Sequence, residues 1–350
     1  MIKNLQSLRF VFIMLIVLSH IIGKSFDFGG ECGVSFFFVL SGFVLFLAYG
    51  CKVMEGSFRT RPFVCKQLLK FYPLHLLTMA VILLMDARIG RYTEWYRLLP
   101  NVFLVQSWIP IDRFFFVANG SSWFLCDVLF FYVVFRKLFL QLNHATVKQL
   151  ATAGILLLGA YVLLAFSIPE GKVNALLYAS PATRIIEFVV GILLFRAWQS
   201  ASSGRIRQWL QSRSTGMSTL VELAITAVIV AAAVAYPHLS PRIRCASLYW
   251  PIAPAVVFVF ATIDRNGGLV TRLLHQPWMV WLGNISFEIY LLHMIVIRIT
   301  QSVYLQMGME GLMPAGWSIA VNTVLTILLA YPVKKYFVDK IYGKLINRVI

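Results

Sequence analysis

Apolar runs dominate the chain, and several approach the ~20 residues that a helix needs to cross a bilayer. The runs are continuous, as in Val11–Leu18 and Thr152–Phe166, whereas barrel strands would alternate polar and apolar residues. Helix bundles and closed barrels are the two structures that span a bilayer. The pattern therefore predicts an all-α, polytopic transmembrane helix bundle with about ten transmembrane helices. The predicted helices are 5–22, 33–50, 68–86, 121–140, 150–168, 182–199, 217–236, 249–264, 284–302 and 316–334.

The segments outside the ten predicted spans do not predict a second domain. Leu98–Trp108 is short and predicts a helix that lies at the membrane interface. The first apolar run lacks a small-residue cleavage site, so it is predicted to be a retained helix and not a signal peptide. No repeat or low-complexity tract interrupts the chain. We therefore expect residues 1–350 to form a single membrane-embedded domain with no separate soluble domain.

Composition agrees with this interpretation. Of the 350 residues, 59% are hydrophobic and only 13% are charged, against roughly 25% charged in soluble domains. A net charge of +17 could indicate nucleic-acid binding, but long apolar spans argue against that partner. The positive-inside rule explains the charge better.

The loop charges also predict the orientation. If the N-terminus is inside, the inner segments carry more than twice as many Lys and Arg residues as the outer ones. This asymmetry predicts an even number of helices, with both termini in the cytoplasm. The predicted outer loop 87–120 is the exception, and its Trp95, Tyr96 and Trp108 suit an interfacial aromatic belt.

Two polar residues in the first predicted helix are candidates for chemistry, because polar groups in a membrane are costly. Arg9 and His20 are separated by close to three helical turns, about 16 Å. One helix face would then present a cation and a base at two depths. The alternative is that His20 is an inert histidine at the water interface.

Two further segments have an ordinary and a functional interpretation. Ser41 and Gly42 let a neighbouring backbone approach closely, which favours a packing helix. The basic segment with Arg59, Arg61, Lys66 and Lys70 supplies either inner-loop charge or a phosphate clamp at the cytoplasmic face.

Later polar residues are candidates as well. Arg184 and Glu187 lie at i and i+3, so they can pair, and a structural pair is favoured. Ser286, Glu288 and His293 punctuate one apolar helix, and His293 is either a second site histidine or a packing residue. The five cysteines lack a C-x-x-C spacing and predict neither a metal site nor a disulfide framework.

Six segments, in this order, resemble the acyltransferase-3 family of integral membrane acyltransferases. They are Leu8-Arg9 leading to Leu18-Ser19-His20; Gly33–Phe43; Phe71-Tyr72-Pro73-Leu74; Ser122-Trp123-Phe124-Leu125 before Phe131-Tyr132; Arg184 with Glu187-Phe188 and Gly191; and Ile285-Ser286-Phe287-Glu288-Ile289-Tyr290-Leu291-Leu292-His293. Each motif is weak alone, but their order along nearly the whole chain is specific.

The resemblance implies transfer of an acyl group, usually acetyl, from cytoplasmic acyl-CoA to a hydroxyl of a surface glycan or a glycolipid. Acetyl-CoA would be a co-substrate, and no permanently bound cofactor or metal is expected. The protein would lie among the lipids of the bacterial inner (plasma) membrane. The family's first-helix histidine is essential, and His20 takes that position. His20 would act as a general base or as a nucleophile that relays the acyl group.

The chain departs from the family at two places. The usual Arg-x-x-Arg before Tyr72-Pro73 is replaced by Gln67 and Lys70, which puts the mode of CoA binding in doubt. Asp127 stands one position before the glutamate that relatives often have. We expect Arg59, Arg61, Lys66 and Lys70 to bind the CoA phosphates, and Arg9 to stabilise the thioester oxygen or orient the CoA tail.

Two other functions remain open from the sequence. A transporter or flippase of an envelope precursor also has many helices with buried polar groups, although the paired breaks of an inverted repeat are not found. An inactive or regulatory relative is suggested by Gln67, and the intact spacing from Arg9 to His20 weighs against it.

Overall fold

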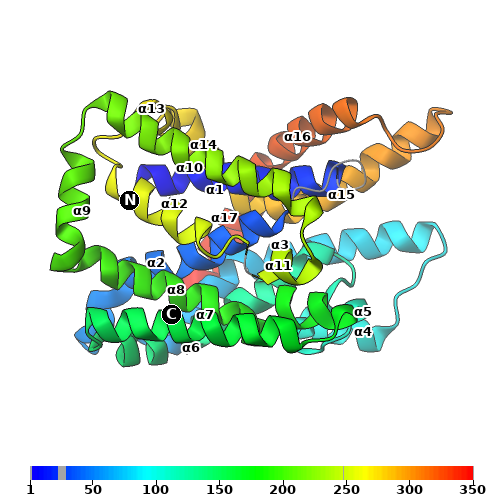
Figure 1. Ribbon diagram of the computed structural model, residues 1–350. Helices are drawn as coiled ribbons and strands as arrows, with labels where there is room; N and C mark the ends of the chain where they lie inside the picture. Colours follow the sequence, from blue (N-terminus) through cyan, green and yellow to red (C-terminus); the bar gives the residue numbers. More distant parts are fainter. Residues whose placement is uncertain (1, 23–28, 247, 350) are drawn as a thin grey trace.

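The computed structural model describes residues 2–22, 29–246 and 248–349, and within these ranges the chain is helical and has no strand (Figure 1). The longer helices are α1 (Lys3–Ile22), α2 (Glu31–Met54), α3 (Thr60–Arg88), α6 (Trp123–Asn143), α7 (Val147–Ser167), α8 (Pro181–Gln199), α10 (Thr215–Ala235), α12 (Ile252–Thr262), α15 (Ser286–Gln306), α16 (Ala315–Pro332) and α17 (Asp339–Val349). The shorter elements are α4 (Trp95–Val102), η1 (Gln106–Trp108), α5 (Asp112–Phe115), η2 (Gly120–Ser122), η3 (Glu170–Lys172), η4 (Asn174–Tyr178), α9 (Ala201–Gln211), η5 (Tyr236–His238), α11 (Pro241–Ala246), α13 (Leu269–Leu274), α14 (Pro277–Asn284) and η6 (Val333–Val338).

All ten predicted spans coincide with helices, so the all-α polytopic bundle is confirmed. Among the described residues, seven helices are long and apolar enough to cross a membrane, or eight if α14 and α15, bent by 66°, form one broken span. The other two predicted spans are α6, which carries Asp127, Arg136 and Lys137, and α12, which has only 11 residues.

The predicted interfacial helix at Leu98–Trp108 is two elements, α4 and η1. Leu104 lies between them in a left-handed backbone conformation, with φ of 54°. A residue in that conformation cannot continue a right-handed helix. The aromatic residues predicted for the interface, Trp95, Tyr96 and Trp108, are exposed, as a membrane belt requires.

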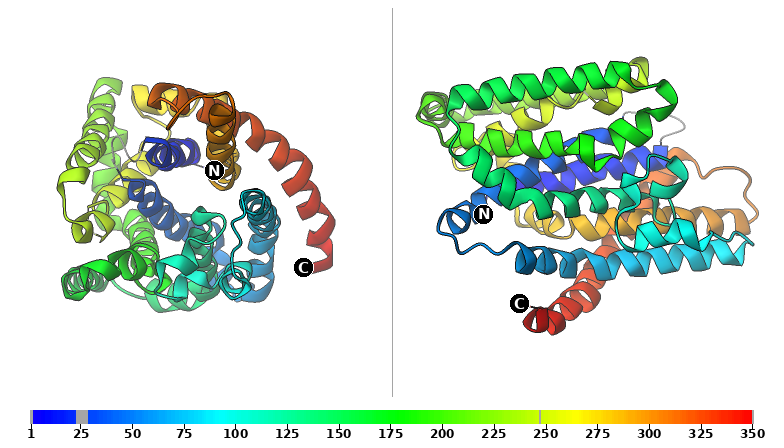
Figure 2. Two further views of the ribbon diagram at one scale, coloured as in Figure 1. Left: turned by 90° about the vertical axis from the view of Figure 1, so that its right-hand side faces the viewer. Right: turned by 90° about the horizontal axis from the view of Figure 1, so that it is seen from below.

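The bundle has two distinct ends. Helices α1, α3 and α15 run one way while α2 and α6 run the other, and α1 and α2 lie near the centre (Figures 1 and 2). We call the end where α1 and α3 begin the basic end, because it carries Arg59, Arg61 and Lys66. The opposite end, which carries segment 89–122, is the loop end. Helix α17 lies toward the basic end (Figure 1).

Two glycines allow α2 and α8 to pack backbone to backbone. A Cβ on Gly42 would lie 2.1 Å from the Phe188 carbonyl oxygen, and one on Gly191 would lie 2.0 Å from that of Val39. Small residues permit this close approach in membrane helices. The packing role predicted for Gly42 is therefore confirmed, with α8 as its partner.

We expect Gly42→Ala to destabilise the bundle by about 1–3 kcal/mol, the usual cost of overpacking. The matched control is Gly159→Ala in α7, where a Cβ would meet no atom within 4 Å. Thermal unfolding of both variants in the same detergent measures the difference. Equal midpoints for Gly42→Ala and wild type would show that α2 and α8 can separate without cost.

Buried hydrogen bonds attach segment 89–122 to the bundle. The Nε2 atom of His75 lies 3.0 Å from the Asn101 carbonyl oxygen. The Asn119 amide donates to Thr78 Oγ1 at 3.1 Å and to the Leu291 carbonyl at 3.0 Å. The segment is thus fixed against both α3 and α15, and it positions the residues just before α6.

Candidate active site

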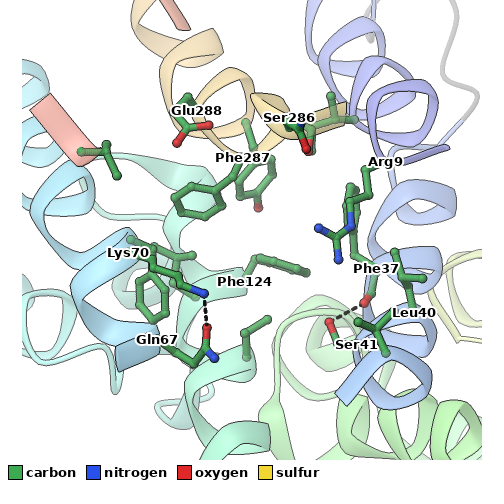
Figure 3. A pocket seen from close by; sticks show the side chains of 18 of the residues that line it. Arg9, Phe37, Leu40, Ser41, Gln67, Lys70, Phe124, Ser286, Phe287 and Glu288 are labelled. Carbon is green, nitrogen blue, oxygen red and sulfur yellow. Dashed lines mark hydrogen bonds between the residues drawn. The ribbon is translucent and has the colours of Figure 1, made fainter. Parts of the chain in front are cut away.

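A cavity of about 600 Å³ lies within the bundle on the basic-end side, and Figure 3 shows it from close by. We call it the basic-end cavity. Its walls come from α1, α2, α3, α6, α14, α15, η6 and α17. Its polar lining residues are Arg9, Ser41, Tyr49, Gln67, Lys70, Tyr132, Asn284, Ser286, Glu288, Tyr290, Lys334, Asp339 and Tyr342.

Arg9 extends into this cavity from α1 (Figure 3). Within the described part of the chain, no carboxylate pairs with its guanidinium, and Tyr132 and Lys70 act on it electrostatically. An unpaired cation at membrane depth is costly and marks a functional site by default. Arg9 is therefore available to an anionic or strongly polar ligand group.

Lys70 enters the same cavity from α3, on the wall opposite Arg9 (Figure 3). Its ammonium donates to Gln67 Oε1 at 3.3 Å, so the glutamine at the departure from the family pattern holds the lysine in place. Arg9, Lys66 and Lys334 all lie within electrostatic reach of Lys70. Cations from three helices thus act on one region.

The second cavity, of about 480 Å³, lies on the loop-end side, and we call it the loop-end cavity. It is rich in aromatic and polar side chains. They include Ser19, His20, Glu31, Phe116, Ser121, Trp123, Asn174, Tyr178, Tyr236, Tyr290 and Arg298.

Local structure fixes several walls of the loop-end cavity. Ala118 has a left-handed backbone, with φ of 54°, in the turn before α6. Strained backbone of this kind clusters at functional sites. The π-helical segment η4 contributes Asn174 and Tyr178. Tyr236 donates to Glu31 Oε1 at 2.7 Å and joins the start of α2 to η5.

His20 faces the loop-end cavity with a defined tautomer. Its Nδ1 atom lies 2.9 Å from the Ile16 carbonyl oxygen. A carbonyl oxygen only accepts, so Nδ1 carries the proton and the Nε2 lone pair is free. The side chain is accessible because the cavity opens onto it. Nε2 can therefore accept a proton from a hydroxyl or attack an acyl carbon.

His293 packs directly against His20. The ring centroids are 5.0 Å apart, and His293 is fully buried. Its Nδ1 donates to the Tyr290 carbonyl, and in the described part of the chain its Nε2 has no hydrogen-bond partner. His293 is thus neighbour to the candidate base as well as a packing residue.

The two cavities meet at two side chains. Ile16 of α1 and Tyr290 of α15 line both of them. The Tyr290 hydroxyl donates to the Ser121 carbonyl at 2.7 Å, and its ring contacts Phe124. One side-chain layer therefore separates a cationic cavity on one side of the bundle from a histidine on the other.

Arg184 and Glu187 form the ion pair that the sequence predicted, at 3.3 Å, with each side chain only 1% exposed. Ser35 donates to Glu187 at 2.6 Å. The Arg184 guanidinium lies over the Tyr178 ring, 5.9 Å from its centroid. The pair therefore supports the aromatic wall of the loop-end cavity from behind.

Asp127 of α6 lies in the same interior. It is fully buried, lines neither cavity, and neither carboxylate oxygen has a hydrogen-bond partner among the described residues. Arg184 and Glu187 are the charges that act on it. Arg184 thus acts electrostatically on two buried carboxylates.

The remaining predicted site residues divide between the two cavities and the surface. Ser41, Ser286 and Glu288 line the basic-end cavity, and Ser41 donates to its own helix at Phe37. Trp123 lines the loop-end cavity and packs against Tyr178 with the two rings tilted by 53° and their centroids 4.7 Å apart. Arg59, Arg61 and Lys66 are not among the residues that line either cavity, and Arg59 and Arg61 are exposed.

Several lining residues were missed by sequence reasoning. Lys334 is the last residue of the predicted span 316–334, two residues after Pro332, and it was not named as a site residue. Glu31, Tyr178 and Tyr236 come from three separate segments, and only the fold brings them together. For metals, the described residues contain no group of three or more His, Cys, Asp or Glu that could hold an ion.

Comparisons with known proteins show which family the chain resembles along nearly its whole length. The profile of the acyltransferase-3 family, described as an acyltransferase domain, matches residues 2–334. Acyltransferase MdmB of Streptomyces mycarofaciens is 28% identical over 286 residues, covering 77% of this chain and 68% of that protein. "Putative peptidoglycan O-acetyltransferase YrhL" of Bacillus subtilis (strain 168) is 23% identical over 360 residues, covering 97% of this chain and 54% of that protein.

A third relative, a "Putative O-acetyltransferase" of Staphylococcus aureus (strain COL), is 21% identical over 350 residues, covering 94% of this chain and 55% of that protein. The chain thus spans about half the length of the last two relatives. No solved structure matches it.

Proposed function

This chain belongs to the acyltransferase-3 family, and from that premise we propose that it transfers an acyl group, acetyl in the first instance, from acyl-CoA to a hydroxyl of a surface or lipid-linked glycan. The observation that carries the proposal is the meeting of the two cavities at Ile16 and Tyr290. This arrangement lets a donor bound in the basic-end cavity reach His20, which faces the loop-end cavity.

The basic-end cavity suits the donor. Acyl-CoA has a phosphorylated nucleotide and a long, flexible arm that ends in the thioester. Cations on three helices favour the phosphates, while apolar residues such as Ile13 and Phe124 line the way toward Ile16. The arm can extend along α1 from Arg9 toward His20, about 16 Å along the helix axis.

The loop-end cavity suits the acceptor. Trp123, Tyr178 and Tyr236 offer ring faces, and Glu31 and Asn174 offer polar groups. Binding sites of this kind combine apolar surface with a few placed polar groups. A sugar ring matches that combination, with the attacking hydroxyl placed near His20. The names of two relatives, which refer to O-acetyl transfer, agree with a hydroxyl acceptor.

His20 then performs the proton transfer. In the general-base route, Nε2 takes the hydroxyl proton as the oxygen attacks the thioester carbon, the C–S bond breaks, and the proton is returned to the CoA thiolate. In the relay route, Nε2 attacks the thioester carbon first, the C–S bond breaks and the CoA thiolate leaves. The hydroxyl oxygen then attacks the acyl carbon, the C–N bond breaks to restore His20, and the hydroxyl proton passes to the CoA thiolate. Because Nδ1–H is held by Ile16, Nε2 is the reacting atom in both routes.

The orientation follows from charge. The basic end carries Arg59, Arg61, Arg205, Arg207 and Lys66, and basic loops favour the cytoplasm. We place the basic end in the cytoplasm of a bacterial inner membrane, where acyl-CoA is made, with both termini on that side. The loop-end cavity then faces the envelope, where the glycan acceptor would lie.

The test compares envelope glycans from cells with and without the wild-type protein by mass spectrometry. A mass increment of one acyl group, labelled when the cells receive isotopic acetate, is the expected result. Purified membranes supplied with labelled acetyl-CoA should give the same product. A glycan that is moved across the membrane without an added acyl group, independently of acetyl-CoA, would contradict the proposal and favour a transporter.

A further inference from the structure

The most informative unassigned residue is Lys334, in the π-helical segment η6. Pro332 precedes it, and proline cannot donate the backbone hydrogen bond that continues a regular α-helix. Such π segments are frequent at functional sites. Here the segment presents Lys334 and Val338 to the basic-end cavity.

Lys334 has carboxylate partners where it lines the cavity. Its ammonium donates to Glu288 Oε1 at 3.3 Å, and the Glu288 side chain is only 2% exposed. A second carboxylate, Asp339, is more distant at 3.8 Å and is 58% exposed. An ammonium has three N–H donors. Lys334 can therefore donate to a further acceptor besides Glu288.

The charge balance in the cavity favours an anion. The cations that line it are Arg9, Lys70 and Lys334, and the lining carboxylates are Glu288 and Asp339. Both carboxylates are paired with Lys334, whereas Lys70 has only the neutral Gln67 and Arg9 has no carboxylate partner in the described part of the chain. Lys70 and Lys334 both line the cavity and act on each other electrostatically. A bound phosphate would relieve that repulsion.

We propose that Lys70 and Lys334 together bind phosphate groups of the CoA donor, with Lys334 supplying the second cation where the family's usual arginine pair is reduced to Gln67 and Lys70. The inference rests on the proposed function and specifies its donor site. It shifts the phosphate contacts from the exposed Arg59 and Arg61 to a pair that lines the cavity.

The neighbouring Lys335 provides a matched control. It has the same charge and is the next residue along the chain. Its ammonium, however, lies over the rings of Tyr331 and Tyr336, 5.7 and 5.3 Å from their centroids. It lines neither cavity. Any effect of net charge at this end of the bundle would therefore be equal for the two lysines, while a direct phosphate contact involves Lys334 alone.

The experiment measures binding of CoA and of pantetheine, which lacks the phosphates, to the purified full chain by calorimetry. Wild type should bind CoA more tightly than pantetheine, and Lys334→Gln should reduce that preference about 10-fold or more, since hydrogen bonds to charged groups are worth about that much. Lys335→Gln should leave the preference unchanged, and Lys334→Arg should retain most of it. An unchanged preference in Lys334→Gln overturns the inference.

Two further measurements distinguish a phosphate contact from damage to the fold and from lipid binding. In Lys334→Gln, the glutamine can still donate to Glu288. The double variant Glu288→Gln/Lys334→Gln leaves no unpaired buried carboxylate at this place. If either variant unfolds at the wild-type temperature and has lost the preference for CoA, the loss is due to the missing charge. In nanodiscs, an effect seen only with phosphatidylglycerol, and not with phosphatidylcholine alone, would assign Lys334 to a lipid headgroup and overturn the proposal. Failure of wild type to bind CoA would overturn the proposed function as well.

Discussion

Replacing His20 with alanine is expected to reduce acyl transfer by about 10²–10⁴-fold, the usual contribution of a positioned acid–base group, and by more if His20 forms a covalent intermediate. The Nε2 atom faces the loop-end cavity, and no second imidazole is among the described residues that line it. His293 is a close neighbour, but it is fully buried. The measurement is labelled acetyl transfer in membranes with equal protein levels.

The control for this prediction is His144→Ala. His144 is an exposed histidine that follows α6 and lines neither cavity. This variant should transfer acetyl groups at the wild-type rate. Equal activities of His20→Ala and His144→Ala would exclude His20 from the chemistry and leave the loop-end cavity without a catalytic group.

The same variant distinguishes the two chemical routes. In the relay route, wild-type protein given labelled acetyl-CoA without acceptor should become labelled, and His20→Ala should not. In the general-base route, neither protein is labelled. The label must be acid- and hydroxylamine-sensitive in the manner of an acyl-imidazole, since an amide on a surface lysine would be stable.

Loss of Arg184 is expected to have the largest effect on stability. Arg184→Leu leaves Glu187 and Asp127 buried together without a cation. Breaking a buried pair from one side costs about 3–5 kcal/mol. We expect little folded protein in membranes, measured by fluorescence-detected gel filtration in detergent and by thermal unfolding of what remains.

Two partner variants make this prediction specific. Glu187→Gln keeps Arg184 within electrostatic reach of Asp127, and it should cost much less than Arg184→Leu. Asp127→Asn tests the other carboxylate. The double variant Asp127→Asn/Arg184→Leu should be more stable than Arg184→Leu alone, because it removes one of the two unpaired acids. Equal losses for Arg184→Leu and Glu187→Gln would mean that Asp127 takes no part in the charge balance.

The chemistry of the departures from the family pattern also becomes clear from the fold. Gln67 does not remove a needed charge from an otherwise intact site, because it orients Lys70 by accepting its hydrogen bond. Asp127 is fully buried, lines neither cavity, and is acted on electrostatically by Arg184. Under the proposed function, the first departure therefore changes how the donor would be held, and the second belongs to the support of the aromatic wall.

The amino-acid sequence by itself determined the class of fold, the position of ten helices and the family. Long apolar runs have few ways to satisfy backbone hydrogen bonds in lipid, so the pattern translates directly into helices. The distance from Arg9 to His20 followed from helix geometry alone. The pairing of Arg184 with Glu187 was equally local, since one helical turn joins them.

Only the tertiary structure decided which polar residues share a cavity. Lys70 and Lys334 are far apart in the sequence, and so are His20 and His293. Their proximity depends on how α3 and η6, or α1 and α15, rotate against each other, and on the glycine contact that sets the spacing of α2 and α8. Sequence periodicity gives the face of each helix but not the partner that the face meets, because packing of many side chains at once selects the partner.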